Sequence, residues 1–117
     1  MIQDFEAQNR TDNRGNPAGG YVQSVGLEID WQDGPLGKAG SKHRKEPNGA
    51  FVETVIAGAL QRIEFYQSAC GGRYACKENA DAIEYLRQAL ATLESRTLRR
   101  QASGVEGTHA PETPDAS

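Results

Sequence analysis

The feature that most constrains the fold is a run of apolar residues at helical spacing in the second half of the chain. Successive members lie 3, 4, 3 and 4 positions apart, at Ile83, Leu86, Leu90, Leu93 and Thr97. This spacing places their side chains on one face of an α-helix. Gly104 follows where a C-terminal cap belongs, because glycine adopts the left-handed conformation at little cost. The pattern predicts a long amphipathic helix over residues 76–102.

A second apolar stripe predicts another helix over residues 49–67, with Asn48 as its N-terminal cap. Its members are Phe51, Val52, Val55, Ile56, Ala59, Leu60 and Ile63. The segment "SACGGRYAC" (68–76) separates the two stripes and interrupts the helical pattern. We therefore expect an antiparallel helical hairpin, with the apolar stripes serving packing and contact between protomers.

The first half of the chain predicts β-structure. In the segment "YVQSVGLEIDW", apolar and polar residues alternate, which indicates a half-buried strand over residues 21–31. The residues on its apolar face are Tyr21, Val25, Leu27, Ile29 and Trp31. A turn-rich lead precedes this strand, with a short strand expected around residues 2–7. A long loop rich in Gly, Pro and Lys follows, and its basic cluster over residues 42–45 is more typical of a solvated loop than of a site.

Together these patterns predict an α+β fold in one domain, with a small N-terminal antiparallel sheet followed by a C-terminal two-helix hairpin. The β region with its basic loop is expected at residues 1–47, the hairpin at 48–104 and a C-terminal tail at 105–117. A chain of 117 residues with 37% hydrophobic residues has a modest core. We therefore expect the protomer to associate with copies of itself.

Charge and hydropathy bear on partners and location. The net charge of −3 argues against general binding of nucleic acid, although a local basic patch is a separate matter. The first ten residues contain two acids and no apolar core of a signal peptide. The longest apolar-rich run, "AFVETVIAGAL", is too short to span a bilayer. We expect a cytoplasmic protein that binds neither membrane nor DNA.

The two cysteines, Cys70 and Cys76, either close a small loop or stay free. A cytoplasmic setting favours free thiols. Together with His43 and His109 they match no zinc spacing, so we expect neither a metal nor a cofactor.

No arrangement of residues predicts catalysis. The sequence contains no recognisable nucleophile elbow, no glycine-rich phosphate loop between strand and helix, and no paired carboxylates in a setting that raises a pKa. Glu106 and His109 form an unconvincing acid/base pair, because a flexible tail does not hold catalytic geometry. The sequence favours a binding protein over an enzyme.

Two segments resemble a known family. "RKEPNGAFVETVIAGALQRIEFYQ" (44–67) and "YACKENADAIEYLRQALATLESRTLRRQASGVEGTH" (74–109) are similar to the hairpin domain of the bacteriophage Thoeris anti-defence and anti-CBASS sponge proteins. The similarity is most specific in the second helix, in "C-[KR]-E-N-x-x-A-I" after an aromatic residue and in "R-T-x-x-R…G-V-E-G-T-H". The segment "GGYVQSVGLEIDWQDGPLG" (19–37) also resembles the N-terminal sheet of the Thoeris anti-defence members.

The resemblance implies a function without chemistry. Members of this family sequester cyclic nucleotide signals, chiefly cyclic ADP-ribose isomers and in some members cyclic di- or trinucleotides, so that the host's effector enzymes are not activated. It implies a hexamer built as a trimer of dimers. The family's pocket maps onto Asn79, Arg96 and Arg100, with Tyr74 or Phe65 as the aromatic that stacks on a base.

Two further parts of the chain are candidate ligand contacts. Arg44 in the basic loop is a candidate for an additional phosphate contact, in the manner of the family's sheet half. The segment "GVEGTH" (104–109) is a candidate lid, because its glycines allow close approach of the backbone and Thr108 and His109 offer polar groups. The alternative for this segment is a disordered chain end.

Helix geometry adds a constraint on the pocket. Asn79 and Arg96 lie 17 positions apart, which is about 25 Å along one helix at about 1.5 Å per residue. One small nucleotide cannot contact both within a protomer. We therefore predict two equivalent pockets across a twofold interface, where two second helices lie antiparallel and Asn79 faces the partner's Arg96 and Arg100. Arg99 is interpreted as an ordinary helix-end cation.

Two other classes of function remain open at this stage. A helical hairpin with several arginines is also compatible with a small nucleic-acid-binding protein, which salt-dependent binding to arbitrary DNA would reveal. A phage protein that inhibits another protein, with no small ligand, is the second alternative.

Overall fold

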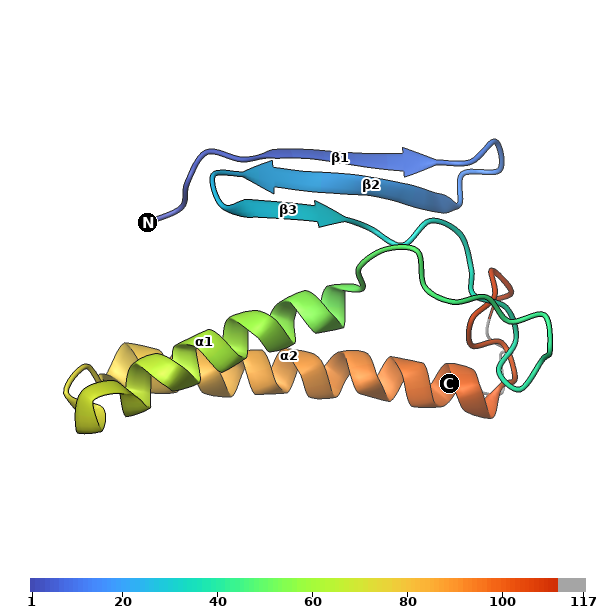
Figure 1. Ribbon diagram of the computed structural model, residues 1–117. Coiled ribbons are helices and arrows are strands. Elements are labelled where there is room, and N and C mark those ends of the chain that lie inside the picture. Colours follow the sequence, from blue (N-terminus) through green and yellow to red (C-terminus); the bar gives the residue numbers. More distant parts are fainter. Residues whose placement is uncertain (112–117) are drawn as a thin grey trace. The chain divides into compact units, whose positions relative to one another are not determined.

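The computed structural model describes residues 1–111 and contains a three-stranded antiparallel sheet followed by two helices, which confirms the predicted α+β class (Figure 1). The strands β1 (Glu6–Thr11), β2 (Pro17–Ser24) and β3 (Leu27–Asp30) lie in the order β1-β2-β3. The helices are α1 (Val52–Gly72) and α2 (Lys77–Ala102). Residues 112–117 of the predicted tail lie outside the described part.

The chain divides into two compact units. The sheet unit comprises residues 1–51 together with the described residues from 99 onward, and the hairpin unit comprises residues 52–98. The last turn of α2 and the C-terminal segment therefore group with the sheet, whereas the sequence pattern grouped residues up to 104 with the hairpin. The C-terminal segment contacts the long loop after β3, where Glu106 pairs with Arg44 and the Gly107 carbonyl accepts from the Gly37 amide.

The prediction of one strand over residues 21–31 is wrong, because the chain turns back within it. β2 ends at Ser24 and β3 begins at Leu27, with Ser24 paired to Leu27 and Tyr21 paired to Asp30. Gly26 has φ of 77°, a left-handed conformation that suits a two-residue turn. Val25 is 84% exposed at this turn instead of lying on a buried face. The alternation of apolar residues continues through the turn, so it did not reveal the break.

The first strand also differs from the expectation, since it covers residues 6–11 rather than 2–7. The turn that follows it is organised by Asp12, whose carboxylate accepts hydrogen bonds from the amides of Arg14 and Asn16, both at 2.9 Å. These backbone hydrogen bonds lower the pKa of Asp12, because they stabilise its charged form. The turn connects β1 to β2 as an antiparallel pair.

The prediction that Asn48 caps the first helix is wrong. Its side-chain oxygen accepts a hydrogen bond from the Asp33 amide at 2.8 Å, and its side-chain nitrogen donates to the Asp33 carbonyl at 3.0 Å. Its own amide donates to the Gln32 side-chain oxygen at 2.8 Å. Asn48 therefore fastens the end of the long loop to the segment after β3, and α1 begins only at Val52.

The predicted interruption between the helices is confirmed. Regular helical geometry in α1 stops at Ala69, which has φ and ψ of −60° and 145°, and Cys70 and Gly71 have positive φ. The Gln67 side chain then bridges to the start of α2: its oxygen accepts from the Cys76 amide at 2.9 Å, and its nitrogen donates to the Cys76 carbonyl at 3.3 Å. Both cysteines are free and exposed.

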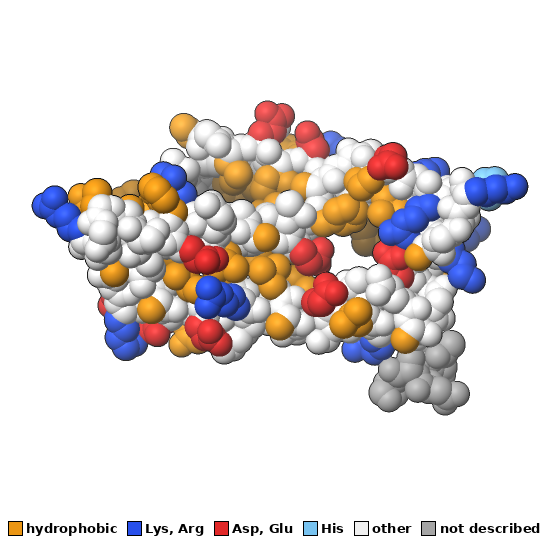
Figure 2. Space-filling model, turned by 60° about the horizontal axis from the view of Figure 1, so that its bottom comes forward, with side chains coloured by type: hydrophobic (Ala, Val, Ile, Leu, Met, Phe, Trp, Pro, Cys, Tyr) orange, Lys and Arg blue, Asp and Glu red, His pale blue; other side chains and the backbone are white. Residues whose placement is uncertain are grey.

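The two helices run antiparallel in the hairpin unit (Figure 1). The stripe residues of α2 and most of those of α1 are half-buried, and no apolar side chain in residues 1–111 is fully buried. Figure 2 shows a face on which apolar side chains reach the surface among acidic and basic ones. One protomer thus covers its apolar side chains only in part, and burial against another surface would stabilise it further.

The C-terminal cap at Gly104 is confirmed. Gly104 has φ of 73°, its amide donates to the Gln101 carbonyl at 3.0 Å, and the Val105 amide donates to the Arg100 carbonyl at 3.0 Å. This pair of bonds is the Schellman motif, which satisfies carbonyls at the helix end. It turns the chain sharply back and starts the segment that follows.

Candidate ligand-binding site

The segment over residues 105–110, which includes most of the candidate lid at 104–109, is folded against the end of α2. The guanidinium of Arg100 donates from Nη2 to three carbonyl oxygens, those of Val105 at 3.2 Å, Thr108 at 3.1 Å and Ala110 at 3.0 Å. The Thr108 hydroxyl donates to the Val105 carbonyl at 2.6 Å and accepts from the Ala110 amide at 3.1 Å. Arg100 therefore organises this segment, a role that the sequence did not predict.

A second arginine fastens the same segment to the basic loop. Arg44 forms a two-pronged pair with Glu106, with Nη1 to Oε2 at 2.7 Å and Nη2 to Oε1 at 3.1 Å. Arg44 Nη1 also donates to the Gly37 carbonyl at 3.0 Å, and the Gly37 amide donates to the Gly107 carbonyl at 2.7 Å. The hydrogen bond and the charge of Arg44 lower the pKa of Glu106, and the carboxylate raises the pKa of Arg44.

Close backbone approach explains the glycine at position 107. It has φ of 79°, and a Cβ atom there would overlap the Gly37 carbonyl oxygen and lie 3.0 Å from Arg44 Nη1. Only glycine fits this contact without a shift of the loop that carries Gly37 and Arg44. The sequence predicted that the glycines of this segment allow close approach to a ligand, whereas Gly107 is needed for contact with the chain's own loop.

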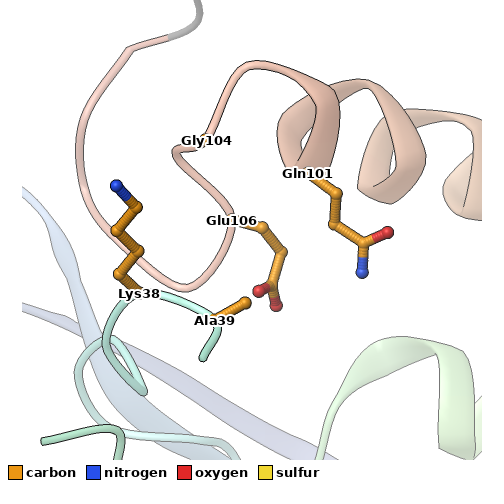
Figure 3. Close-up of a pocket in the computed structure, with 5 residues that line it drawn as sticks. All are labelled: Lys38, Ala39, Gln101, Gly104 and Glu106. Carbon is orange, nitrogen blue, oxygen red and sulfur yellow. The ribbon is translucent and has the colours of Figure 1, made fainter. Parts of the chain in front are cut away.

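A small pocket lies beside the contact between Arg44 and Glu106 (Figure 3). It has a volume of about 160 Å³ and is lined by Lys38, Ala39, Gln101, Gly104 and Glu106. In Figure 3 the Glu106 carboxylate lies between Ala39 and Gln101, while the Lys38 ammonium extends away from it. Pockets for drug-sized ligands have volumes of about 300–1,000 Å³, so this one is too small to enclose a nucleotide in a single protomer.

The predicted residues of the hairpin lie at its two ends. Asn79 is half-buried in the first turn of α2, where its amide is directed at Cys76 Sγ at 3.4 Å. Arg96 is exposed near the other end of the helix. The structure therefore does not bring Asn79 and Arg96 together within one protomer, as their sequence separation required.

The two candidate aromatic residues belong to the end of the hairpin that carries Asn79. Phe65 is 47% exposed near the end of α1, and Tyr74 is 56% exposed in the connection between the helices. The Arg62 guanidinium lies 5.1 Å from the ring centre of Phe65 and 5.1 Å from that of Tyr66. Such an arginine and aromatic cluster offers both a stacking surface and a positive charge.

Sequence reasoning did not select Arg62 or Tyr66. Arg62 lies three positions before Phe65 and four before Tyr66, and this spacing predicts the contact because such side chains lie on one helical face. By contrast, no sequence signal connects Arg44 with Glu106, which lie 62 positions apart. His109 is exposed, and Arg44 and Thr108 are half-buried.

Residues 1–111 contain no group of three or more His, Cys, Asp or Glu side chains placed to hold a metal ion. Within the same residues, neither helix combines the length and the apolar character that a membrane crossing requires.

Comparison with known proteins gives one informative result. No family model matches the chain. The chain is similar to Thoeris anti-defense 1 of Bacillus phage SBSphiJ7, with 37% identity over 81 residues. These residues are 69% of this chain and 51% of the phage protein, so the chain spans about half the length of the curated relative that it matches.

Proposed function

We propose, because the chain belongs to the Thoeris anti-defence family, that it counters bacterial immunity by binding and retaining a cyclic nucleotide signal without degrading it. The ligand class is that of cyclic ADP-ribose isomers, with cyclic di- and trinucleotides as further candidates. Retention of the signal keeps effector enzymes of Thoeris and related defences inactive. The observation that carries the proposal is the 37% identity to a phage anti-defence protein.

The geometry of the hairpin unit supports a shared pocket. One end of the hairpin carries Asn79 and the exposed aromatic residues with Arg62, and the other end carries Arg96. Two hairpins whose α2 helices lie antiparallel would place the aromatic end of one beside Arg96 of the other. A nucleotide held there would have its base stacked on an aromatic ring and its phosphates near an arginine.

Binding energies show what such a pocket requires. Nanomolar affinity corresponds to about 12 kcal/mol. Hydrogen bonds to charged groups contribute about 1.5 to 3 kcal/mol each, and stacking of a base contributes about 1 to 3 kcal/mol. Contacts from Arg96, Arg100 and one aromatic ring fall short of the required amount of about 12 kcal/mol, and the entropy lost on association widens the gap. The proposed site must therefore enclose its ligand with backbone groups, for which the segment 105–110 with Thr108 and His109 is a candidate.

The test is a retention assay. The purified protein is incubated with cyclic ADP-ribose isomers or cyclic dinucleotides, filtered to remove unbound ligand and denatured, and the released molecule is analysed. Recovery of intact ligand is the expected result. Recovery of an altered molecule would indicate an enzyme, and no retention of any of these ligands would contradict the proposal.

A pair of variants tests the position of the site. Arg96→Ala is expected to abolish retention while leaving the mass of the assembly unchanged. Arg87→Ala is the matched control, because it removes another exposed arginine from the same helix. Arg87 pairs with Glu64 of the same hairpin, at 3.6 Å, and is not part of the proposed pocket. Loss of the fold in Arg96→Ala, or equal loss of retention in both variants, would contradict a ligand-binding role for Arg96.

Binding of nucleic acid is the second candidate, supported by the arginines on the helices. Salt-dependent binding of arbitrary DNA, with no retention of cyclic nucleotides, would favour it. Neither activity would leave inhibition of another protein as the function to test.

A further inference from the structure

The outer edge of the sheet has no partner within the described residues. β1 pairs with β2 on one side only, because the sheet order is β1-β2-β3. All six residues of β1 are exposed. An unpaired edge of this length presents backbone donors and acceptors on which another strand can pair.

Hydrogen bonding in the sheet shows which backbone groups point outward. The Trp31 amide donates to the Gly20 carbonyl at 2.9 Å, so the backbone groups of Gly20 point toward the β3 side. Those of the next residue, Tyr21, therefore point toward β1, where Tyr21 is paired with Gln8. It follows that Gln8 is bonded toward β2, whereas its neighbours Ala7 and Asn9 direct their amides and carbonyls to the open edge.

The charges on β1 are arranged symmetrically about Gln8. Glu6 and Arg10 lie two positions to either side of Gln8, and the contacts of both with Tyr21 place them on one face of the strand. The pairing of β1 with β2 shifts its register between Asn9 and Thr11, beyond the residues paired regularly with β2. Tyr21, opposite Gln8, contacts both: its hydroxyl donates to Glu6 at 3.0 Å, and the Arg10 guanidinium lies 5.8 Å from its ring centre. A twofold rotation of the strand about Gln8 therefore brings Arg10 to the position of Glu6 and Glu6 to the position of Arg10.

We propose that the β1 edge is an interface with a second copy of this chain, in which two β1 strands pair antiparallel about a twofold axis at Gln8. In this register Glu6 lies opposite the partner's Arg10, and Arg10 lies opposite the partner's Glu6. Opposite charges directly across two strands stabilise the pair. The outward groups of Ala7 lie opposite those of the partner's Asn9, so that the backbone groups of both residues gain hydrogen-bond partners.

The joined sheet retains one apolar face and one charged face. Phe5, Val22 and Leu27 line a hollow of about 290 Å³ on the face opposite Glu6 and Arg10, and Phe5 is 60% exposed. A twofold axis perpendicular to the sheet places this apolar face on the same side in both copies. The pairing therefore extends one amphipathic sheet instead of burying charges against apolar side chains.

This interface is separate from the α2 contact invoked for ligand binding, and it does not depend on any ligand. A closed assembly in which every protomer uses two different twofold interfaces contains an even number of copies. Failure of the retention assay would leave the β1 pairing unaffected, and failure of the β1 pairing would leave the ligand pocket unaffected.

Cysteine cross-linking tests the register. In a protein with Cys70 and Cys76 replaced by serine, Gln8→Cys places two thiols across the axis, with Cβ atoms about 4.5–5.5 Å apart, within reach of a disulfide. The matched control is Thr11→Cys on the same strand, which removes no charge from the proposed interface. Its counterpart is displaced by six residues, about 20 Å, and cannot be reached. We expect a covalent dimer under mild oxidation for Gln8→Cys only. No dimer at this position, or equal yields in the two variants, would overturn the proposal.

Charge reversal tests the complementarity. Arg10→Glu opposes like charges twice per interface and is expected to lower the mass of the assembly measured by light scattering. The double variant Glu6→Arg/Arg10→Glu restores the opposite pairs and should restore the mass. Glu28→Lys, on β3 at the opposite side of the sheet from β1, is the control and should leave the mass unchanged. An unchanged mass for Arg10→Glu, or no restoration in a double variant that circular dichroism shows to be folded, would contradict the interface.

Discussion

Gly107→Ala is the substitution for which the structure makes the sharpest statement about the C-terminal segment. Gly107 combines φ of 79° with a contact so close that an added Cβ would overlap the Gly37 carbonyl oxygen. The alanine variant therefore faces two costs, a left-handed backbone and a displaced neighbour. We expect the segment 105–110 to detach from the loop over residues 37–44 much more often than in the original protein.

The magnitude follows from these two effects. A left-handed conformation costs a residue with a side chain about 1–2 kcal/mol. In the attached state, the added Cβ atom also displaces the loop and breaks the 2.7 Å hydrogen bond from the Gly37 amide to the Gly107 carbonyl, which contributes about 0.5–1.5 kcal/mol net. The sum of about 1.5–3.5 kcal/mol corresponds to a rise of about 10- to 400-fold in the detached population.

Hydrogen exchange at the Gly37 amide measures this population, because the amide is protected only while the segment is attached. Gly104→Ala is the matched control: Gly104 has φ of 73°, but a Cβ atom there meets nothing within 4 Å. It therefore bears only the conformational cost, and we expect a rise of at most about 5- to 30-fold. Equal exchange of the Gly37 amide in the two variants, or faster exchange in Gly104→Ala, would refute the close contact.

Two other predictions concern the contact between Arg44 and Glu106 and the hydrogen bonds between Gln67 and Cys76 in the hairpin. Because the pKa of Glu106 is lowered, its contribution to attachment is fully present above the ordinary value of 4.5 and is lost as pH falls through the lowered value. Exchange of the Gly37 amide, corrected for its intrinsic pH dependence, should show this acid step, and Glu106→Gln should lack it. Gln67→Ala removes both hydrogen bonds to Cys76 and should lower the free energy of unfolding by about 1–2 kcal/mol in denaturant titrations. Gln61→Ala on the same helix is its control, and an equal loss there would assign the effect to the helix rather than to the bridge.

Local patterns were sufficient where a structure depends on neighbours in the chain. The apolar spacing in α2 predicted its limits to within one residue, and glycine at position 104 predicted the cap that ends it. The interruption around Cys70 was also predicted, because a segment without helical periodicity separated two periodic ones. Each of these features arises from contacts within about five positions along the chain.

Local patterns failed where two interpretations share the same periodicity. An alternating segment has the same appearance whether it is one strand or two strands joined by a two-residue turn, and the turn at Gly26 was therefore missed. Asn48 is a favourable residue for a helix cap, but pairing with Gln32 and Asp33 satisfies its side chain instead. In both cases the partner that decided the outcome lies in another segment.

The candidate site shows the same division. The sequence by itself determined that arginines lie on one helix, that Asn79 and Arg96 are too far apart for one small ligand, and that a glycine cap turns the chain after Ala102, because helix rise and backbone sterics are local properties. Only the tertiary structure decided that Arg100 gathers three carbonyls, that Arg44 pairs with Glu106 and that β1 has an open edge. These features depend on which distant segments meet, and residue spacing alone does not contain that information.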